Sequence, residues 1–136
     1  MKLIFNVHSY GQHILYPWGY TYTPLQDTTV YSALASGIAA KMTAVRNNTF
    51  QSGQWSDLLN YLGSGVTEDW AWHDEGIYCL GSELYPSTDP PGFVIPESAI
   101  QPAVSEFIPG ALYAIEWVNQ PVPIRDWYKY SNPNLK

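Results

Sequence analysis

The stretch "FNVHSYGQHILYPWGYTYT", residues 5–23, holds the clearest structural pattern in the chain. It begins inside Leu3–Val7, a short and mostly apolar run that is typical of a buried strand. His8 follows directly, and Ile14–Tyr16 is a candidate for a second strand, which the next proline would end. A histidine at the end of an apolar strand is therefore the first feature that needs an explanation.

The rest of the chain alternates between helix-like and strand-like segments. A helix is predicted to start at Asp27 or Thr28, either of which can cap it. Its apolar residues recur at helical spacing and are Val30, Leu34, Ile38, Met42 and Val45. Ile77–Leu84 has the composition of a further strand. This alternation favours an α/β fold with about three strands, too few for a self-sufficient sheet, so open edges are expected.

Two segments between these elements are less regular. Gln54–Tyr61 is predicted to be a short helix or an irregular segment. The stretch "GSGVTEDW", residues 63–70, is predicted to be a flexible loop. In such a loop Glu68 and Asp69 would be solvated charges.

The C-terminal part of the chain is rich in proline. A helix is expected from about Pro96 to Asn119, with a break or kink at Pro109-Gly110. The tail from Gln120 is expected to pack irregularly through Trp127 and Tyr128.

Composition limits the class of protein. The chain has 136 residues, enough for one domain, and a formal net charge of −6, which argues against a nucleic-acid partner. Its aromatic share of 15% points to exposed aromatic surface or a recognition cleft. Cys79 is the one cysteine, so no disulfide forms within the chain. We recognise neither a signal peptide nor an apolar run long enough to span a membrane.

Few residues suggest chemistry on their own. A lone histidine such as His8 is more often a hydrogen-bonded structural residue than a metal ligand, and His13 and His73 add no metal-binding spacing. Glu83 lies within the largely apolar "IYCLGSEL". A buried carboxylate there is unfavourable unless it is paired, bound to metal or catalytic. An equally good alternative is that the strand lies at the edge of the sheet and Glu83 faces water.

Four blocks together are more specific: "HSYGQHILYPWGYT", "YLGSGVTEDW", "GIYCLGSEL" and "GFVIP". In this order and at these spacings, the chain resembles the zinc metallocarboxypeptidases of the carboxypeptidase A/B type, from about Leu3 to about Glu106. The resemblance implies the C-terminal part of a mixed-sheet α/β fold, an incomplete sheet flanked by helices. Residues 1–119 would belong to a peptidase catalytic domain, and residues 120–136 would form an irregular tail.

The resemblance also implies a function, the zinc-dependent removal of the C-terminal residue from peptides and proteins. His8 matches the last of three protein ligands to zinc, and Glu83 matches the general base. Ser9 and Tyr10 match cleft residues that are joined by a cis peptide bond. Tyr61 matches the mobile tyrosine that closes over the terminal carboxylate of the substrate.

Glu68 matches the residue at the base of the specificity pocket. In the family an apolar residue there accompanies a preference for apolar or aromatic C-terminal residues, and an acid accompanies a preference for Lys or Arg. We therefore expect a basic preference, although Glu in place of the usual Asp would alter the depth of the pocket.

Several parts of the family's site have no match in this chain: two zinc ligands, the oxyanion arginine, and the Asn-Arg pair that docks the terminal carboxylate. We therefore expect the isolated chain to lack peptidase activity. It would be a fragment, one piece of a split enzyme, or a degenerate descendant, and the intact residues favour a fragment. Its open sheet edge would pair with the missing N-terminal half or with itself. By analogy with the family, an extracellular location is expected.

Two other functions remain open at this stage. The first is a pseudoenzyme that binds peptide C-termini without cutting them. The second is an aromatic-rich module that stacks sugars on Trp and Tyr. Against it, a sugar-binding module has no reason to reproduce the order and spacing of the four blocks.

Overall fold

The computed structural model of the protein describes residues 1–26 and 28–120, and a mixed sheet lies at its centre. The strands are β1 (Leu3–Ser9), β2 (His13–Tyr16), β3 (Gln51–Gln54) and β4 (Tyr78–Leu84). Their order across the sheet is β1-β4-β2-β3. β1 runs parallel to β4, β2 runs antiparallel to β4, and β3 runs parallel to β2. The predicted α/β class with a mixed sheet is confirmed.

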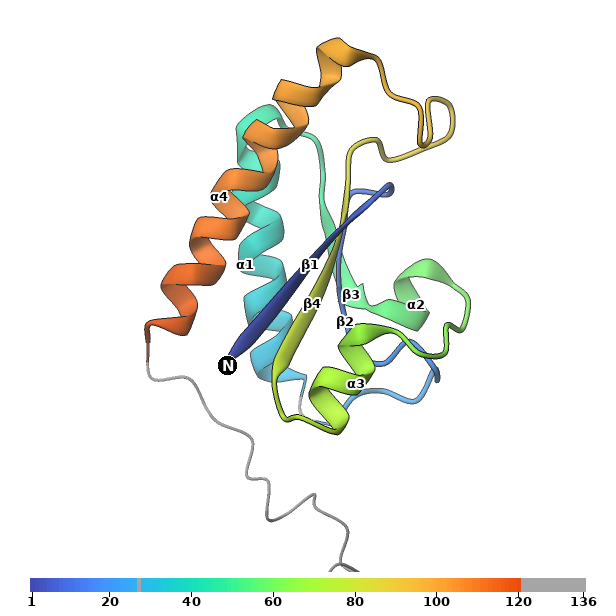
Figure 1. Ribbon diagram of the computed structural model, residues 1–136, viewed down its shortest axis with the longest axis vertical. Helices are drawn as coiled ribbons and strands as arrows, with labels where there is room; N and C mark the ends of the chain where they lie inside the picture. The colour runs from blue at the N-terminus through green and yellow to red at the C-terminus, as the bar shows by residue number, and fades with distance from the viewer. Residues whose placement is uncertain (27, 121–136) are drawn as a thin grey trace, which may run out of the picture.

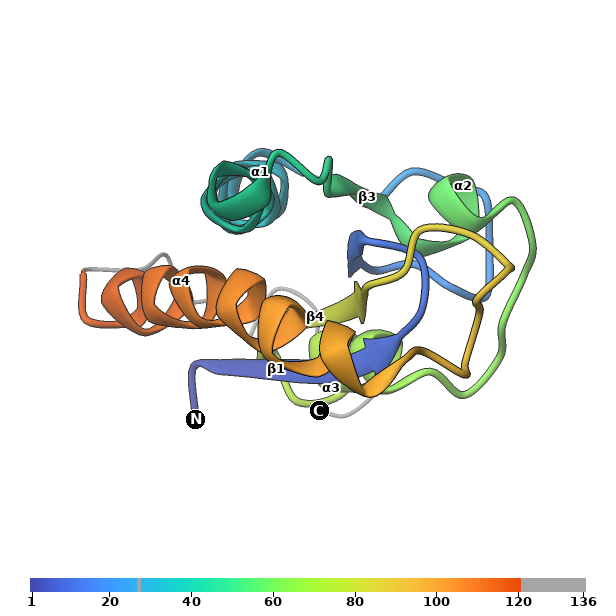
Figure 2. The same cartoon turned by 90° about the horizontal axis from the view of Figure 1, so that it is seen from above.

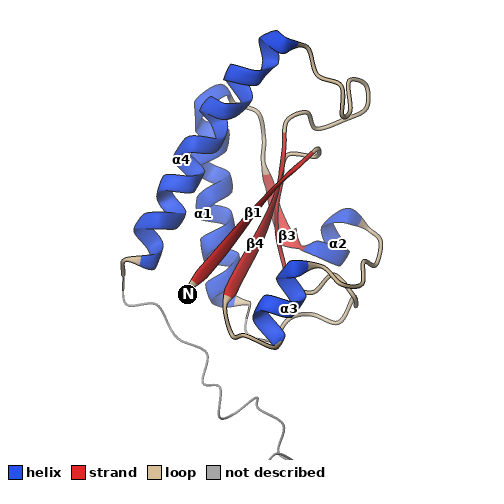
Figure 3. Ribbon diagram, viewed as in Figure 1, coloured by secondary structure: helices blue, strands red, loops and turns tan. Residues whose placement is uncertain are grey.

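Helices cover both faces of this sheet (Figures 1 and 3). The two long helices, α1 (Thr29–Arg46) and α4 (Ile100–Val118), pack against one another on one face. The two short helices, α2 (Trp55–Leu59) and α3 (Thr67–His73), lie on the other side, as the view from above also shows (Figure 2). A 3-10 turn, Glu97–Ala99, leads into α4.

The main core lies between the sheet and α1. Leu34, Ile38 and Met42 of α1 are fully buried and belong to one cluster with Ile14 of β2 and Leu80 of β4. The predicted helical spacing therefore identifies most of the buried face.

The ends of α1 differ from the prediction. Val45 is 40% exposed, although its position on the helix places it on the same face as Leu34 and Ile38. Thr28 occupies the N-cap position but its side chain makes no capping hydrogen bond, and Asp27 lies outside the described residues.

Of the break or kink predicted at Pro109-Gly110, the break does not occur, because α4 runs continuously through both residues. Proline removes only one helical hydrogen bond, and the packing of the helix replaces that stabilisation. Gly110 is a contact point instead of a breaker. A Cβ atom placed on it would lie 2.6 Å from Cγ of Met42, so the missing side chain lets α4 approach α1 closely.

Three further expectations need correction or qualification. The sheet has four strands where about three were expected. The additional strand, β3, was not predicted because its sequence, Gln-Ser-Gly-Gln, lacks the β-branched and aromatic residues that are typical of a strand. The predicted loop at residues 63–70 contains the start of α3. The expectation for the tail concerns residues 121–136, which lie outside the described part of the chain. Gln54–Tyr61, by contrast, contains the short helix α2, which was one of the two alternatives predicted for this segment.

The sheet is open, as expected. β1 and β3 each have a neighbour on one side only. Next to β1, α4 exposes apolar residues that follow one another at helical spacing: Ile100, Val104, Ile108, Leu112 and Ile115. We call these five residues the α4 stripe. None of the helices in the described residues has the length and apolar character needed to cross a membrane.

Candidate functional site

His8 and Glu83 lie side by side at the same end of two neighbouring parallel strands. The register of β1 and β4 pairs His8 with Glu83. Paired residues in a ladder project from the same face of the sheet, so both side chains point to the side that carries α3. Both line a cleft of about 290 Å³. The fold therefore brings an imidazole and a carboxylate that are far apart in the sequence to one place.

Glu83 is half-buried within the cleft wall. β4 is an inner strand, so the alternative of an edge-strand glutamate facing water does not hold. Its Oε2 atom is buried and has no hydrogen-bond partner among the described residues. Burial raises the pKa of the Glu83 carboxyl; the nearby His8 lowers this pKa and the nearby Glu68 raises it further. A carboxylate whose pKa is raised in a cleft is suited to accept a proton.

Glu68 enters the same cleft from the first turn of α3. It is only 4% exposed, which contradicts the expectation of a solvated charge. Nδ2 of Asn6 donates a hydrogen bond of 3.1 Å to Oε1 of Glu68. A Cβ atom on Gly81 would lie 2.9 Å from the same oxygen, so glycine at this position leaves room for the carboxylate. Among the described residues Glu68 has no ion-pair partner.

Asp69 is also buried, but it has a structural role. Its carboxylate accepts hydrogen bonds from the backbone N–H of Gly19, at 2.9 Å, and of Tyr20, at 3.0 Å. Burial raises the pKa of Asp69 and these two hydrogen bonds oppose that shift. The expectation that Asp69 is solvated is therefore wrong, because it fastens α3 to the loop that follows β2.

The other candidate residues, Ser9, Tyr10 and Tyr61, are not among the residues that line the cleft. Tyr61 is 54% exposed, and its ring packs edge-on against Trp55, with 4.8 Å between the ring centroids. Tyr10 packs in the same way on Phe93, also at 4.8 Å. Ser9 ends β1, and the Ser9–Tyr10 peptide bond is cis, as the resemblance implied.

Several residues of the cleft wall were not among the candidates from the sequence, and Asn6, Trp55 and Gly81 are three of them. A signal for two of them was present. Side chains alternate along a strand with a period of two, so Asn6 shares a face with His8, and Gly81 shares one with Glu83. No comparable signal pointed to Trp55, which comes from α2 on another part of the chain.

The donor atoms of the cleft decide what metal chemistry it can support. A catalytic zinc ion takes three protein ligands, usually histidine nitrogen and carboxylate oxygen, and keeps one open position. In residues 1–26 and 28–120, no three His, Cys, Asp or Glu side chains gather closely enough to hold a metal ion. His8 is suited to supply one ligand, and Glu83 is placed beside it as a second polar group. These residues fit one part of a zinc site.

A larger hollow, of about 590 Å³, lies between β1 and α4. Its lining is mostly apolar and includes Phe5, Phe107 and Ile115, without a carboxylate or a histidine. It therefore offers surface for packing instead of groups for chemistry.

The sequence model of the zinc carboxypeptidases matches residues 1–110. Bovine carboxypeptidase B is 34% identical over 119 residues, which cover 87% of this chain and 28% of that protein. Rat carboxypeptidase A1 is 34% identical over 106 residues, which cover 78% of this chain and 25% of that protein. The chain thus spans about a quarter of the length of these relatives.

A solved structure of a related protein has a similar fold. Bovine thrombin-activatable fibrinolysis inhibitor, in complex with tick carboxypeptidase inhibitor, superposes with a TM-score of 0.79 at 31% identity. The match covers 87% of this chain and 40% of that one. With the sequence match over residues 1–110 and the shared mixed sheet, these similarities show that the chain belongs to the zinc carboxypeptidase family.

Proposed function

We propose that residues 1–119 form the C-terminal part of a carboxypeptidase catalytic domain, which removes the C-terminal residue from peptides and proteins. The observation that supports this most strongly is the pairing of His8 with Glu83 at the cleft, on adjacent strands of the sheet. A half-buried carboxylate whose pKa is raised, beside an exposed imidazole, is unfavourable for stability alone and useful for proton transfer.

Each candidate residue then has a distinct role. His8 would supply one nitrogen ligand to zinc, which when bound would lower the pKa of a water ligand and polarise the scissile carbonyl. Glu83 accepts the proton from that water and returns it to the leaving amine. Ser9 and Tyr10 contact the peptide along the cleft. Tyr61, which is exposed and packs edge-on against Trp55, closes over the terminal carboxylate.

Glu68 sets the preference for the side chain that is removed. It is buried, its carboxylate is oriented by Asn6, and it has no cation partner among the described residues. A Lys or Arg side chain entering the cleft would supply the missing positive charge. Of the relatives reported above, one is a carboxypeptidase B and one a carboxypeptidase A1, so similarity alone does not choose between a basic and an apolar preference.

The 136-residue chain on its own should not hydrolyse peptides. One histidine does not hold zinc tightly at neutral pH, because useful affinity needs several convergent ligands. Metal analysis of the purified chain tests this: tight zinc at one ion per chain would contradict it.

A chimeric enzyme tests the proposed activity directly. The 119-residue segment of bovine carboxypeptidase B that this chain matches would be replaced by the chain, and hydrolysis of peptides ending in Lys, Arg or Phe would be measured. Activity that Glu83→Gln abolishes, and that the exposed-carboxylate control Asp57→Asn retains, supports the proposal. A folded, zinc-loaded chimera without activity contradicts it, and peptide binding without hydrolysis would favour the pseudoenzyme.

The same chimera tests the role of Glu68. A charge-assisted hydrogen bond contributes about 1.5–3 kcal/mol, so Glu68→Leu should reduce the preference for Lys over Phe roughly 10- to 100-fold. Equal turnover of Lys and Phe substrates before the substitution would contradict the basic preference.

The partner surface follows from the open sheet. The free edge of β1, the apolar hollow beside it and the α4 stripe together form one side of the molecule that further carboxypeptidase polypeptide, or a second copy of the chain, would cover. By analogy with the family, we also propose an extracellular location.

A further inference from the structure

His13 lies on the opposite side of Glu83 from His8. It is the first residue of β2, and the antiparallel register of β2 and β4 pairs it with Glu83. Directly opposed residues of an antiparallel pair project from the same face, with Cβ atoms about 5 Å apart. The row across the sheet is therefore His8, Glu83, His13, from three adjacent strands.

The backbone at Gly11 brings the two side chains to one spot. A Cβ atom on Gly11 would lie 2.7 Å from Nδ1 of His13 and 3.3 Å from Cβ of Glu83. The Nδ1 edge of the imidazole and the base of the Glu83 side chain therefore contact the same part of the backbone. A side chain at this position would clash with the imidazole unless His13 shifted.

Both side chains have a polar atom that remains unsatisfied there. Nδ1 of His13 and Oε2 of Glu83 are buried, and neither has a hydrogen-bond partner among the described residues. Buried polar atoms in native proteins nearly always have a partner. Two such atoms on opposed residues, one able to donate and one able to accept, are complementary.

The charge state of the pair fits this complementarity. Burial lowers the pKa of His13, so its imidazole is neutral at neutral pH and carries one N–H. The other titratable groups that act on Glu83 are His8 on β1 and Glu68 on α3. A neutral donor on the β2 side would satisfy Oε2 without adding a full positive charge near the cleft.

We propose that His13 is a positioning residue for Glu83: its Nδ1–H donates a hydrogen bond to Oε2, directly or through one shared water molecule. This bond fixes the rotamer of the carboxylate and leaves the other oxygen directed to the cleft. The importance of this bond for catalysis rests on the proposed role of Glu83 as the base. The existence of the hydrogen bond does not depend on that role.

The tautomer of His13 tests the hydrogen bond in the complete 136-residue chain without metal. Long-range proton–nitrogen NMR on the nitrogen-15-labelled chain, above the pKa of His13, reports which ring nitrogen carries the proton. We expect the Nδ1–H form, although an unconstrained imidazole prefers Nε2–H. A predominant Nε2–H form in the unmodified chain overturns the proposal, and this reading needs no variant.

Two leucine variants then locate the acceptor. Glu83→Leu removes it, so the His13 tautomer should revert toward Nε2–H. Glu68→Leu removes a carboxylate from the same cleft without touching the pair, so the tautomer should not change. An unchanged tautomer in folded Glu83→Leu overturns the proposal, as does an equal response to both variants.

The catalytic consequence is measured separately in the chimera. His13→Leu should lower kcat with little change in KM, because the substrate contacts are intact. An inactive chimera in which His13 is in the Nδ1–H form would contradict the proposed function and support the hydrogen bond. An active chimera in which His13 is in the Nε2–H form would support the proposed function and contradict the hydrogen bond.

Discussion

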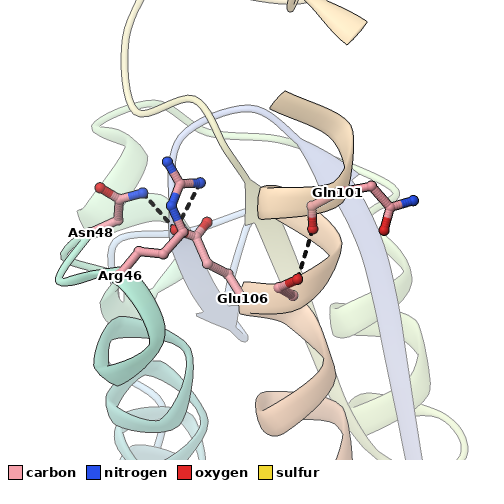
Figure 4. A network of polar contacts seen from close by, with 5 residues as sticks. Arg46, Asn48, Gln101 and Glu106 are labelled. Atoms are coloured by element: carbon pink, nitrogen blue, oxygen red, sulfur yellow. Dashed lines mark hydrogen bonds and ion pairs between the residues drawn. The ribbon is translucent and has the colours of Figure 1, made fainter. Parts of the chain in front are cut away.

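Glu106 of α4 and Arg46 of α1 form an ion pair in which the acid is buried and the base is half in solvent. Nη1 of Arg46 lies 3.4 Å from Oε1 of Glu106, and the two side chains are 40% and 1% exposed. Asn48 donates a hydrogen bond to the same oxygen (Figure 4). Oε2 of Glu106 has no partner among the described residues, so the contacts of Oε1 with Arg46 and Asn48 are what stabilise the buried charge.

Removing the cation should therefore be more damaging than neutralising the acid. Arg46→Met leaves a buried carboxylate without its charge partner, and we expect a loss of about 2 kcal/mol in the free energy of unfolding. Glu106→Gln keeps an acceptor for Asn48 and should lose less. Urea denaturation of both single variants and the double variant measures this, with Lys41→Met as the control on the exposed face of α1. A double variant less stable than Arg46→Met alone would contradict the argument.

The pH dependence of stability should reveal the burial of Glu83. Its pKa is raised above the ordinary value of 4.5 in the folded chain, so the folded state binds the proton more tightly than the unfolded state does. The charged form is thus disfavoured by folding, and stability falls as the pH rises from about the unfolded pKa through the folded one. Glu83→Gln should consequently stabilise the chain at pH 7 and have little effect near pH 4. Thermal unfolding at the two pH values measures the difference, and equal effects would contradict the assignment.

The carboxylate of Asp69 should be needed to hold the loop after β2. Asp69→Ala leaves the N–H groups of Gly19 and Tyr20 without their acceptor, so we expect a loss of about 2–3 kcal/mol. Hydrogen exchange of those two amides should accelerate more than exchange in α1. Asp74→Ala, at the exposed C-terminal end of the same helix, is the matched control and should change neither quantity.

The α4 stripe should cause the isolated chain to associate. Ile108, Leu112 and Ile115 are each about half exposed on one side of α4, next to the free edge of β1. Leu112→Lys should lower the apparent mass in sedimentation experiments, while Ser36→Lys adds the same charge to the exposed face of α1 and should not. Monomeric behaviour of the unmodified chain at high concentration would contradict this prediction.

Local sequence patterns predict most of the regular elements of this fold. Helical spacing identified α1, and apolar runs identified β1, β2 and β4, because in these segments burial follows the period of the structure. β3 could not be predicted, since its polar sequence becomes a strand only by pairing with β2. The burial of Glu68 and Asp69 was also hidden, because it depends on Asn6, Gly19 and other partners far away in the sequence.

The candidate site was predictable in a different way. His8 and Glu83 were singled out by the family resemblance, whereas their adjacency depends on a parallel register that no local pattern encodes. His13 was set aside for lack of metal-binding spacing. Its relation to Glu83 appears only once β2 is seen to run antiparallel to β4.

The ladder between β1 and β4 also determines which changes of length the site can tolerate. A strand rises about 3.3 Å per residue, so one residue inserted into either strand would turn His8 or Glu83 to the opposite face of the sheet. An insertion in the exposed turn after α1, around Asn47, would leave the rung that joins them in place. The separation of the two groups is thus set by backbone pairing, and the long connection between them is free to change in length.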